Sequence, residues 1–521
     1  MKFTIPITER AQKIVSQMDI DSLLNQITCP QFFSHTPLPS QNNFGALFFH
    51  ASPKSALIEQ INRFKSQCSF PPLITTDMEN GPGEMITDGT QFPSIMAAGI
   101  AGDEQLAYEM GRAAAHEGRA VGYNWSLSPC VDIAAVADSP MVSIRSAGVD
   151  ADTVIRTAGA YMRGLQENGM VATLKHFPGD GYDIYDQHLT VSTNPLSREE
   201  WWQHSGRVFQ ELIDQGAMAI MPGHISLPAF DQKWADTDFY PPASVSRPLL
   251  HDLLRGEMGF DGLIVSDAVN MGGFAGFINR FDASALFLEA GGDCVLFPNL
   301  DYFNKEMKVR LENGMLKKET LIARAERIVS LKDKLRLLDR DTVPPQVLDY
   351  ERHKATSRAL VDKCVKVVRD RAGILPAKIE KSTRIAHVII SMRYEDEKPL
   401  YEELEKQFRQ YSDNVETLLC NCPEEIFDPV YAGKYDLIIC SVSSRHDYGT
   451  NIARLAGPKA RLMMGGWMKL GTPTIFISHF HPFIEKEYFF STDTIINTYG
   501  STLYTMERVV KGIVGIQPFL K

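Results

Sequence analysis

The sequence predicts an α/β protein: a (β/α)8 TIM-type barrel followed by a smaller α/β sandwich domain. The chain has 521 residues, which is too long for one ordinary core, because domains usually contain about 50–250 residues. Between about residues 45 and 300, short apolar runs alternate with longer amphipathic stretches. Polar side chains also follow several of these runs at the point where each ends. Together these observations favour a barrel over an open sheet for the first domain.

The elements of the first domain follow from this alternation. Strands that alternate with helices indicate parallel pairing through helical crossovers. We predict strands at Gly45–Phe49, Pro72–Asp77, Asn124–Asp132, Val171–Phe177, Ala217–Ile225, Gly262–Asp267 and Cys294–Phe297. Helices are predicted at Asp103–Ala120, Ala151–Asn168, Glu199–Gln215, Ser246–Met258 and, as a core-facing helix that closes the barrel, Lys317–Leu338.

Five polar residues mark the ends of the predicted strands: Asp77, Asp132, His176, His224 and Asp267. In TIM-type barrels the carboxyl ends of the strands form the catalytic face. A single polar residue at a strand end means little, since chains turn there. Five such residues favour an active site at this face.

A domain boundary is expected at Asp339–Pro345, where Pro344 and Pro345 break regular structure. We place the barrel at residues 1–340, a linker at 341–380 and a second α/β domain at 381–521. Predicted strands of the second domain are Arg384–Ser391, Tyr435–Ser441 and Thr472–Ser478, and its helical segments are Tyr401–Tyr411, Ala453–Ala456 and Leu503–Val514. A structural or oligomerisation role is the expectation for this domain.

Composition excludes several classes of partner. The net charge of −11 argues against nucleic acid, because phosphate binding needs a basic face. No stretch approaches the ~20 apolar residues that span a bilayer, and the start lacks the apolar core of a signal peptide. The eight cysteines are scattered without a zinc-type pair of C-x-x-C motifs. We therefore expect a cytoplasmic, soluble protein with no metal, cofactor or membrane partner.

The most informative segment is Lys175–His188, which reads K-H-F-P-G-D-G-Y-D-I-Y-D-Q-H. Its glycines and proline predict a loop that leaves a strand, and loops on rigid scaffolds often display reactive groups. Asp186 stands two residues before His188, where a carboxylate can orient the ring and stabilise its charged form. The segment predicts a histidine that acts as general acid or base.

A second element, Gly262–Asp267, is an apolar strand that ends in one aspartate. This position would present the Asp267 carboxylate to the mouth of the barrel. By itself, such a group is compatible with a nucleophile, a metal ligand, a base or a helix cap. The residues alone leave these alternatives open.

These motifs resemble glycoside hydrolase family 3, and most closely its bacterial β-N-acetylglucosaminidase branch. The branch pattern is K-H-F-P-G, a short loop and D-x-H, which Lys175–His188 matches. The family nucleophile stands in G-[LIV]-x-x-S-D, matched by Gly262–Asp267. Its sugar-binding aspartate and arginine stand in x-D-x-E-x-G and I-R-S-x-G, matched by Thr76–Gly81 and Ile144–Gly148. The resemblance covers nearly the whole chain and weakens after the boundary.

The resemblance implies a role for each matched residue. Asp267 would attack the anomeric carbon and form a covalent glycosyl-enzyme intermediate. His188 would protonate the leaving oxygen and later activate water, with Asp186 as its partner. The residues expected to bind the substrate are Asp77, Arg145, Lys175, His176, Asp132 and His224. We expect the loop that carries His188 to move during turnover, because glycines open it.

The expected reaction is release of N-acetylglucosamine from the non-reducing end of β-linked glycans or cell-wall fragments. Members that act on plain glucosides typically take their acid from a glutamate in the second domain, whereas D-Q-H in the barrel favours N-acetylhexosamine. No arginine follows Asp77 within Met78–Met85, which weakens the case for acidic aglycones. A phosphorylase and a β-glucosidase on the same scaffold are alternatives, and a non-catalytic sugar-binding protein is a third.

Overall fold

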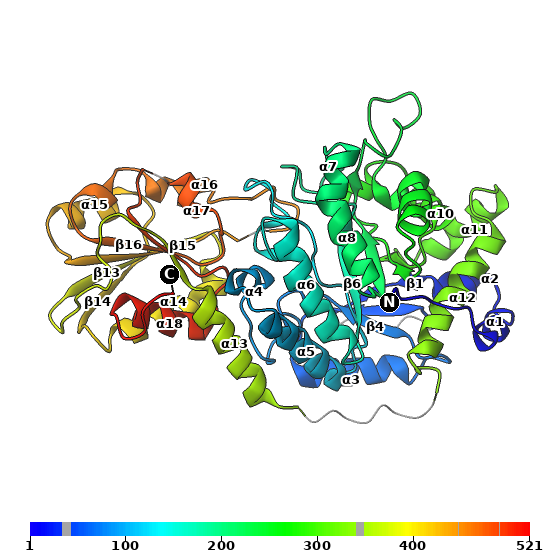
Figure 1. Cartoon of the computed structure of the whole chain (residues 1–521), viewed down its shortest axis with the longest axis horizontal. Helices are drawn as coiled ribbons and strands as arrows, with labels where there is room; N and C mark the ends of the chain where they lie inside the picture. Colours follow the sequence, from blue (N-terminus) through cyan, green and yellow to red (C-terminus); the bar gives the residue numbers. More distant parts are fainter. Residues whose placement is uncertain (34–42, 340–347, 446, 489, 521) are drawn as a thin grey trace. The chain divides into compact units, whose positions relative to one another are not determined.

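The computed structural model describes residues 1–33, 43–339, 348–445, 447–488 and 490–520 (Figure 1). These residues fall into two compact units. The first comprises Met1–Phe92, Glu104–Val142 and Ser146–Lys354, and the second comprises Pro93–Asp103, Ser143–Arg145 and Ala355–Lys521. Among the described residues, no helix has both the length and the apolar character needed to cross a bilayer.

The first unit is a closed barrel of parallel strands. One sheet runs in the order β10-β8-β6-β5-β4-β3-β2, and β1 pairs with β11. Strands β1 and β2 flank Pro30 and form one extended segment, which joins the two sheets on one side. On the other side, Val265 after β10 forms a bridge with Cys294 before β11. These two connections complete a ring. The strands are β1 (Thr28–Cys29), β2 (Gln31–Phe32), β3 (Ala46–Phe49), β4 (Leu73–Thr76), β5 (Trp125–Ser126), β6 (Val171–Phe177), β8 (Ala219–Pro222), β10 (Leu263–Ile264) and β11 (Val295–Leu296).

Helices surround this ring and bury their apolar faces against it, as α5, α6 and α8 illustrate (Figure 1). Sequence determines where they begin: Asp150, for example, caps α6 by accepting a hydrogen bond from the Thr153 amide. The helices are α1 (Glu9–Val15), α2 (Ile20–Gln26), α3 (Lys54–Lys65), α5 (Glu104–Val121), α6 (Ala151–Gln166), α7 (Arg198–Gln203), α8 (Ser205–Asp214), α9 (Gly272–Ala275), α10 (Arg280–Ala290), α11 (Phe303–Glu312) and α12 (Lys318–Lys334). A further helical segment, of π type, covers Pro248–Glu257, and short strands β7 (Ser192–Thr193) and β9 (Ile225–Ser226) pair with each other.

The second unit is a sheet with helices on both faces. Its order is β12-β17-β16-β15-β13-β14, parallel except for β12. Helices α14 and α18 cover one face, and α15 and α16 cover the other, where Trp467 packs with Ile438 and Phe476 (Figure 1). The strands are β12 (Lys366–Asp370), β13 (Arg384–Ser391), β14 (Asn414–Leu418), β15 (Leu437–Ser443), β16 (Thr474–Ser478) and β17 (Thr494–Asn497). The helices are α4 (Ile95–Ala101), α13 (Tyr350–Cys364), α14 (Tyr394–Phe408), α15 (Glu424–Tyr431), α16 (Gly457–Ala460), α17 (Ile484–Glu487) and α18 (Leu503–Ile513).

The predicted fold class is confirmed, and three predicted elements are corrected. The strand expected at Asn124–Asp132 is short because Pro129 follows it, although Cys130 still bridges Lys175. The helix expected at Glu199–Gln215 is two helices, α7 and α8, separated at His204, whose backbone is not helical. Ala453–Ala456 is not helical, and α16 begins one residue later, at Gly457.

The boundary between the predicted domains stays a prediction. Pro344 and Pro345, on which it rests, lie outside the described residues. The expected linker at residues 341–380 contains all of α13 and all of β12, and β12 pairs with β17 as an edge of the second sheet.

Candidate active site

The five polar residues expected at the strand ends of the barrel all lie at one edge of it. Asp77 follows β4, Asp132 follows β5, His176 lies near the end of β6, His224 follows β8 and Asp267 follows β10. All these strands are parallel, so their carboxyl ends share one edge. Arg145 groups with the second unit, where its guanidinium lies 5.5 Å from the centre of the Tyr448 ring. Its position relative to the barrel site stays a prediction.

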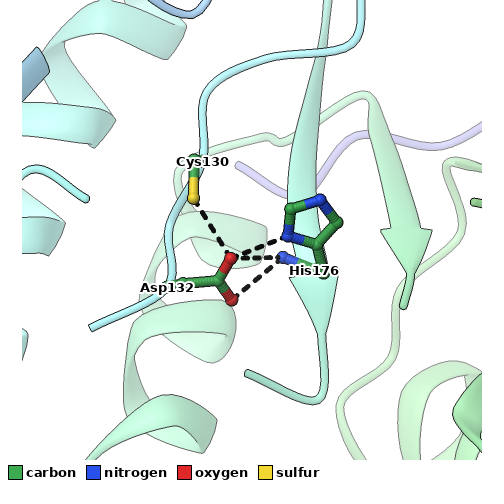
Figure 2. A group of neighbouring side chains, drawn as sticks. All are labelled: Cys130, Asp132 and His176. Atoms are coloured by element: carbon green, nitrogen blue, oxygen red, sulfur yellow. Dashed lines mark hydrogen bonds and ion pairs between the residues drawn. The ribbon is translucent and has the colours of Figure 1, made fainter. Parts of the chain in front are cut away.

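The Asp132 carboxylate is the most heavily hydrogen-bonded group of the site (Figure 2). It accepts bonds from the His176 amide at 3.1 Å, from His176 Nδ1 at 2.7 Å and from the Asp180 amide at 2.7 Å. The Cys130 thiol donates to it at 3.1 Å. Burial opposes the ionised form, but the charge and hydrogen bond of His176 hold the pKa of Asp132 below its ordinary value. Asp132 is 1% exposed, so it fixes the His176 ring and the start of the following loop.

Glycines allow this loop to leave the strand so tightly. Gly179 and Gly181 have φ angles of +113° and +95°, a region that side chains disfavour. A Cβ on Gly181 would also lie 2.0 Å from the Ile133 carbonyl oxygen. The motif Lys175–Gly181 therefore requires glycine at these positions for conformational and steric reasons.

Asp267, the expected nucleophile, is buried among histidines. Its Oδ2 lies 3.9 Å from His176 Nε2, and its Oδ1 accepts a hydrogen bond from the Ala268 amide at 2.7 Å. Burial alone would raise its pKa, but electrostatic interactions with His176, His224 and His188 lower that pKa below the ordinary value. A carboxyl group with a lowered pKa remains an anion throughout the range above pH 4, as a nucleophile requires.

His188 and Asp186 form the expected pair on the loop. His188 Nδ1 lies 2.8 Å from Asp186 Oδ1, and the His188 amide donates to the same oxygen at 2.8 Å. Asp186 is fully buried, whereas 25% of the His188 side chain is exposed. A carboxylate against Nδ1 fixes the orientation of the imidazole ring and stabilises its charged form. This is the geometry of an oriented acid/base histidine.

The loop is attached to the barrel through Gln187, which the motif analysis did not assign. Its side chain donates to Asp180 Oδ2 at 3.3 Å and accepts from the His224 amide at 2.8 Å. The amides of Gly272 and Gly273 donate to the carbonyls of His188 and Gln187. Whether the loop moves during turnover stays a prediction.

His224 is enclosed by the protein. Its Nε2 lies 3.1 Å from the Ala268 carbonyl and its Nδ1 lies 2.9 Å from the Ser244 hydroxyl. Burial lowers its pKa, so the ring is neutral near pH 7. The neutral ring then donates from Nε2 and accepts at Nδ1, and both nitrogens are used within the protein.

Lys175 carries the positive charge at the other side of the site. Its Nζ lies 2.8 Å from Asp77 Oδ1 and 2.7 Å from Glu79 Oε1. Lys175 and Glu79 are buried, while 35% of the Asp77 side chain is exposed. Sequence reasoning missed Glu79, although a buried lysine needs a buried counter-charge and Glu79 stands two residues after Asp77. Asp77 remains accessible to a ligand.

A carboxylate anion beside an oriented proton-transfer pair, at the catalytic end of a barrel, supplies the groups that glycoside cleavage uses. The class of protein that this fold and site define is a barrel glycosidase. A model of the glycosyl hydrolase family 3 N-terminal domain matches residues 33–331. The chain belongs to this family, which confirms the resemblance seen in the motifs.

Two characterised relatives extend this result. The chain is 29% identical to the beta-N-acetylglucosaminidase/beta-glucosidase of Cellulomonas fimi, over 97% of this chain and 93% of that protein. It is 35% identical to the beta-hexosaminidase of Methylobacillus flagellatus, over 44% of this chain and 65% of that protein. The chain is thus similar to enzymes of the branch that its motifs resemble.

Two solved structures share the whole architecture. The beta-glucoside phosphorylase BglX superposes with a TM-score of 0.90 at 27% identity, covering 100% of this chain and 97% of that chain. A glycoside hydrolase family 3 beta-N-acetylglucosaminidase from Paenibacillus superposes with a TM-score of 0.80 at 21% identity, covering 96% and 97%. The second likeness concerns the fold alone.

Metal dependence can be tested at one cluster. Among the residues that the structure describes, Cys130, Asp132 and His176 could place three ligand-type atoms within 4.8 Å of one another (Figure 2). The Asp132 oxygens are already bonded to two amides, a ring nitrogen and a thiol, which suits a hydrogen-bonded network better than a metal site. We expect glycosidase activity to be unchanged after dialysis against EDTA. Activity that is lost on dialysis and restored by a divalent metal would contradict this.

Proposed function

We propose that the protein is a retaining glycoside hydrolase that releases N-acetylglucosamine from the non-reducing end of β-linked glycans or cell-wall fragments. The observation that carries this proposal is the position of Asp267, a buried carboxylate at the carboxyl ends of the strands whose Oδ2 lies 3.9 Å from His176 Nε2. His188, which is partly exposed, is paired with Asp186. The relatives' names support the choice of N-acetylglucosamine.

In the proposed mechanism Asp267 attacks the anomeric carbon while the leaving group departs. Glycoside cleavage passes through an oxocarbenium-like state, which a nearby carboxylate stabilises and then captures. His188 gives its Nε2 proton to the leaving oxygen in the first step. In the second step the neutral ring takes a proton from water, which attacks the glycosyl–Asp267 ester. Asp186 stabilises the charged form of the ring in both steps.

We assign the sugar-binding roles from the exposure and the contacts of each side chain. Asp77 is accessible and is paired with Lys175, so we assign these two residues to the sugar hydroxyls; the same role for Arg145 stays a prediction. His176 Nε2 faces Asp267 and can approach a hydroxyl beside the anomeric carbon. Asp132 and His224 are buried and saturated by protein partners, which supports a positioning role for both.

The protein is further proposed to work in the cytoplasm. All eight cysteines lie in the described part of the chain and none of them forms a disulfide, which is typical of reducing compartments.

Loss of the nucleophile should nearly abolish activity. In Asp267→Ala the carboxylate that stabilises and captures the oxocarbenium-like state is gone, so kcat on a chromogenic β-N-acetylglucosaminide should fall at least ~10³-fold. Asp252→Ala removes an exposed carboxylate from the Pro248–Glu257 segment and serves as the matched control, with kcat unchanged. Wild-type activity in Asp267→Ala would show that another group is the nucleophile.

The preference for the glycone distinguishes an N-acetylglucosaminidase from a β-glucosidase. With an acid/base histidine in the barrel loop, we expect kcat/KM to be at least ~10-fold higher on the 4-nitrophenyl N-acetylglucosaminide than on the 4-nitrophenyl glucoside, about the effect of one well-placed polar contact to the acetamido group. The two chromogens share one leaving group, so their ratio measures recognition of the glycone. A ratio in favour of the glucoside would overturn the N-acetylglucosamine assignment.

A phosphorylase is the second candidate, because a beta-glucoside phosphorylase superposes over the whole chain. A neutral histidine also repels an incoming phosphate less than a second carboxylate would. Under the main proposal, free N-acetylglucosamine is the dominant product at millimolar phosphate, and the rate does not rise with phosphate concentration. Glycosyl-1-phosphate as the main product, measured by ³¹P NMR, would replace the hydrolase with the phosphorylase.

A further inference from the structure

A groove of about 790 Å³ opens on the barrel unit beside the loop that carries His188. We name it the aromatic groove. Among the residues that line it are Tyr185, Thr190, Trp234, Phe239, Gly272 and Phe277. Its volume lies in the range of small-molecule sites in proteins. None of the roles assigned to the active site uses it.

Aromatic side chains dominate the walls of the aromatic groove. The Trp234 ring lies 5.3 Å from the Phe277 ring, centre to centre, at an angle of 65°. The Trp234 amide donates to the Phe239 carbonyl at 2.7 Å, which closes the segment between them into a turn. Phe239 is 72% exposed and Tyr185 is 55% exposed. Exposed apolar side chains gathered around a groove indicate a binding site.

Part of the aromatic groove is formed by residues that are next to the proton-transfer pair in the chain. Tyr185 precedes Asp186, and Leu189 and Thr190 follow His188, and all three line the groove. Gly272, which also lines it, donates its amide to the His188 carbonyl at 2.7 Å. A general acid must lie against the oxygen of the leaving group. The sugars on the leaving-group side of the scissile bond therefore depart on the side of the His188 loop.

The chemistry of the walls suits a neutral sugar. None of the described residues that line the groove is a lysine or an arginine, and its one carboxylate, Asp238, is paired with Lys233 at 2.7 Å. Thr190, Thr193 and Thr237 also line the groove. Pyranose rings present flat C–H faces to aromatic rings and hydroxyls at their edges, so this combination matches them.

We propose that the aromatic groove binds the leaving-group sugars of a neutral β-linked N-acetylglucosamine oligosaccharide. This inference rests on the proposed function and names the substrate side that the groove recognises. It predicts that the enzyme processes oligosaccharides with neutral sugars next to the cleaved unit in preference to anionic fragments.

The test compares two substrates in the full-length protein. One is the β-1,4-linked trisaccharide of N-acetylglucosamine, and the other is N-acetylglucosaminyl fluoride, which has no sugar on its leaving side. Phe239→Ala and Trp234→Ala should each lower kcat/KM on the trisaccharide about 10-fold, the loss of one or two stacking contacts. The rate on the fluoride should stay within about twofold of wild type. Trp234→Phe, which keeps an aromatic ring, should recover most of the loss.

Tyr431→Ala is the matched control, because Tyr431 is 76% exposed and lies outside the groove. Its kinetics on both substrates should equal those of the wild type. Binding is measured separately in the Asp267→Ala protein, where the trisaccharide should change tryptophan fluorescence and Trp234→Phe should remove most of that change.

Each other outcome overturns the proposal in a recognisable way. Equal losses on both substrates would mean that the aromatic residues support the fold or the His188 loop. Unchanged kinetics on the trisaccharide would mean that the groove binds no leaving-group sugar. Unchanged trisaccharide kinetics with a dimer that dissociates in Phe239→Ala would make the groove an interface between copies of the chain. Failure of the wild type on the fluoride would instead refute the proposed function itself.

Discussion

The candidate site depends on the hydrogen bonds that the Asp132 carboxylate accepts inside the barrel mouth. A buried carboxylate is costly unless donors surround it, and here two amides, a histidine ring and a thiol converge on it. These donors belong to the segment after β5, the end of β6 and the loop that leaves β6. One side chain therefore fixes the His176 ring against Asp267 and sets the direction of the loop that carries His188.

The remaining charges of the site are balanced around this anchor. Lys175 lies between Asp77 and Glu79, and Asp267 lies in the field of three histidines. Gln187 joins the loop to the end of β8 by bonding both Asp180 and the His224 amide. Groups held in this way need little rearrangement when charge develops on the substrate, which is how a site stabilises a transition state electrostatically.

Sequence reasoning succeeded where the signal is local. Buried parallel strands give continuous apolar runs, so β3, β4, β6 and β13 were found within one or two residues. Family motifs also pointed to Asp77, Lys175, His176 and Asp267, which lie at one edge of the barrel; their catalytic and binding roles stay predictions. The short β5 was missed because its hydrophobic pattern continues past the point where Pro129 ends the strand. The break at His204 was missed because the hydrophobic pattern of the helix continues across this non-helical residue.

Contacts between residues that are far apart in the sequence could not be predicted from the sequence alone. Glu79 matters because Lys175 contacts it, and Gln187 matters because Asp180 and the His224 amide do. No spacing rule connects Lys175 with Glu79 or Gln187 with the His224 amide, since the packing of the strands in the barrel brings these residues together. The aromatic groove is a similar case: its walls come from the His188 loop, the irregular segment after β9 and the turn before α10. Irregular segments have no periodicity to predict from.

The claim on which the account depends is that Asp267 forms a covalent bond to the sugar. The direct measurement is peptide mass spectrometry on His188→Ala protein, acid-quenched during turnover of an N-acetylglucosaminide with an activated aryl leaving group. That leaving group needs no acid, whereas the second step lacks its base, so the intermediate should accumulate. The account predicts one N-acetylhexosaminyl adduct, located on Asp267. An adduct on another residue, or continued turnover of the aryl substrate with no adduct at any time, would contradict it.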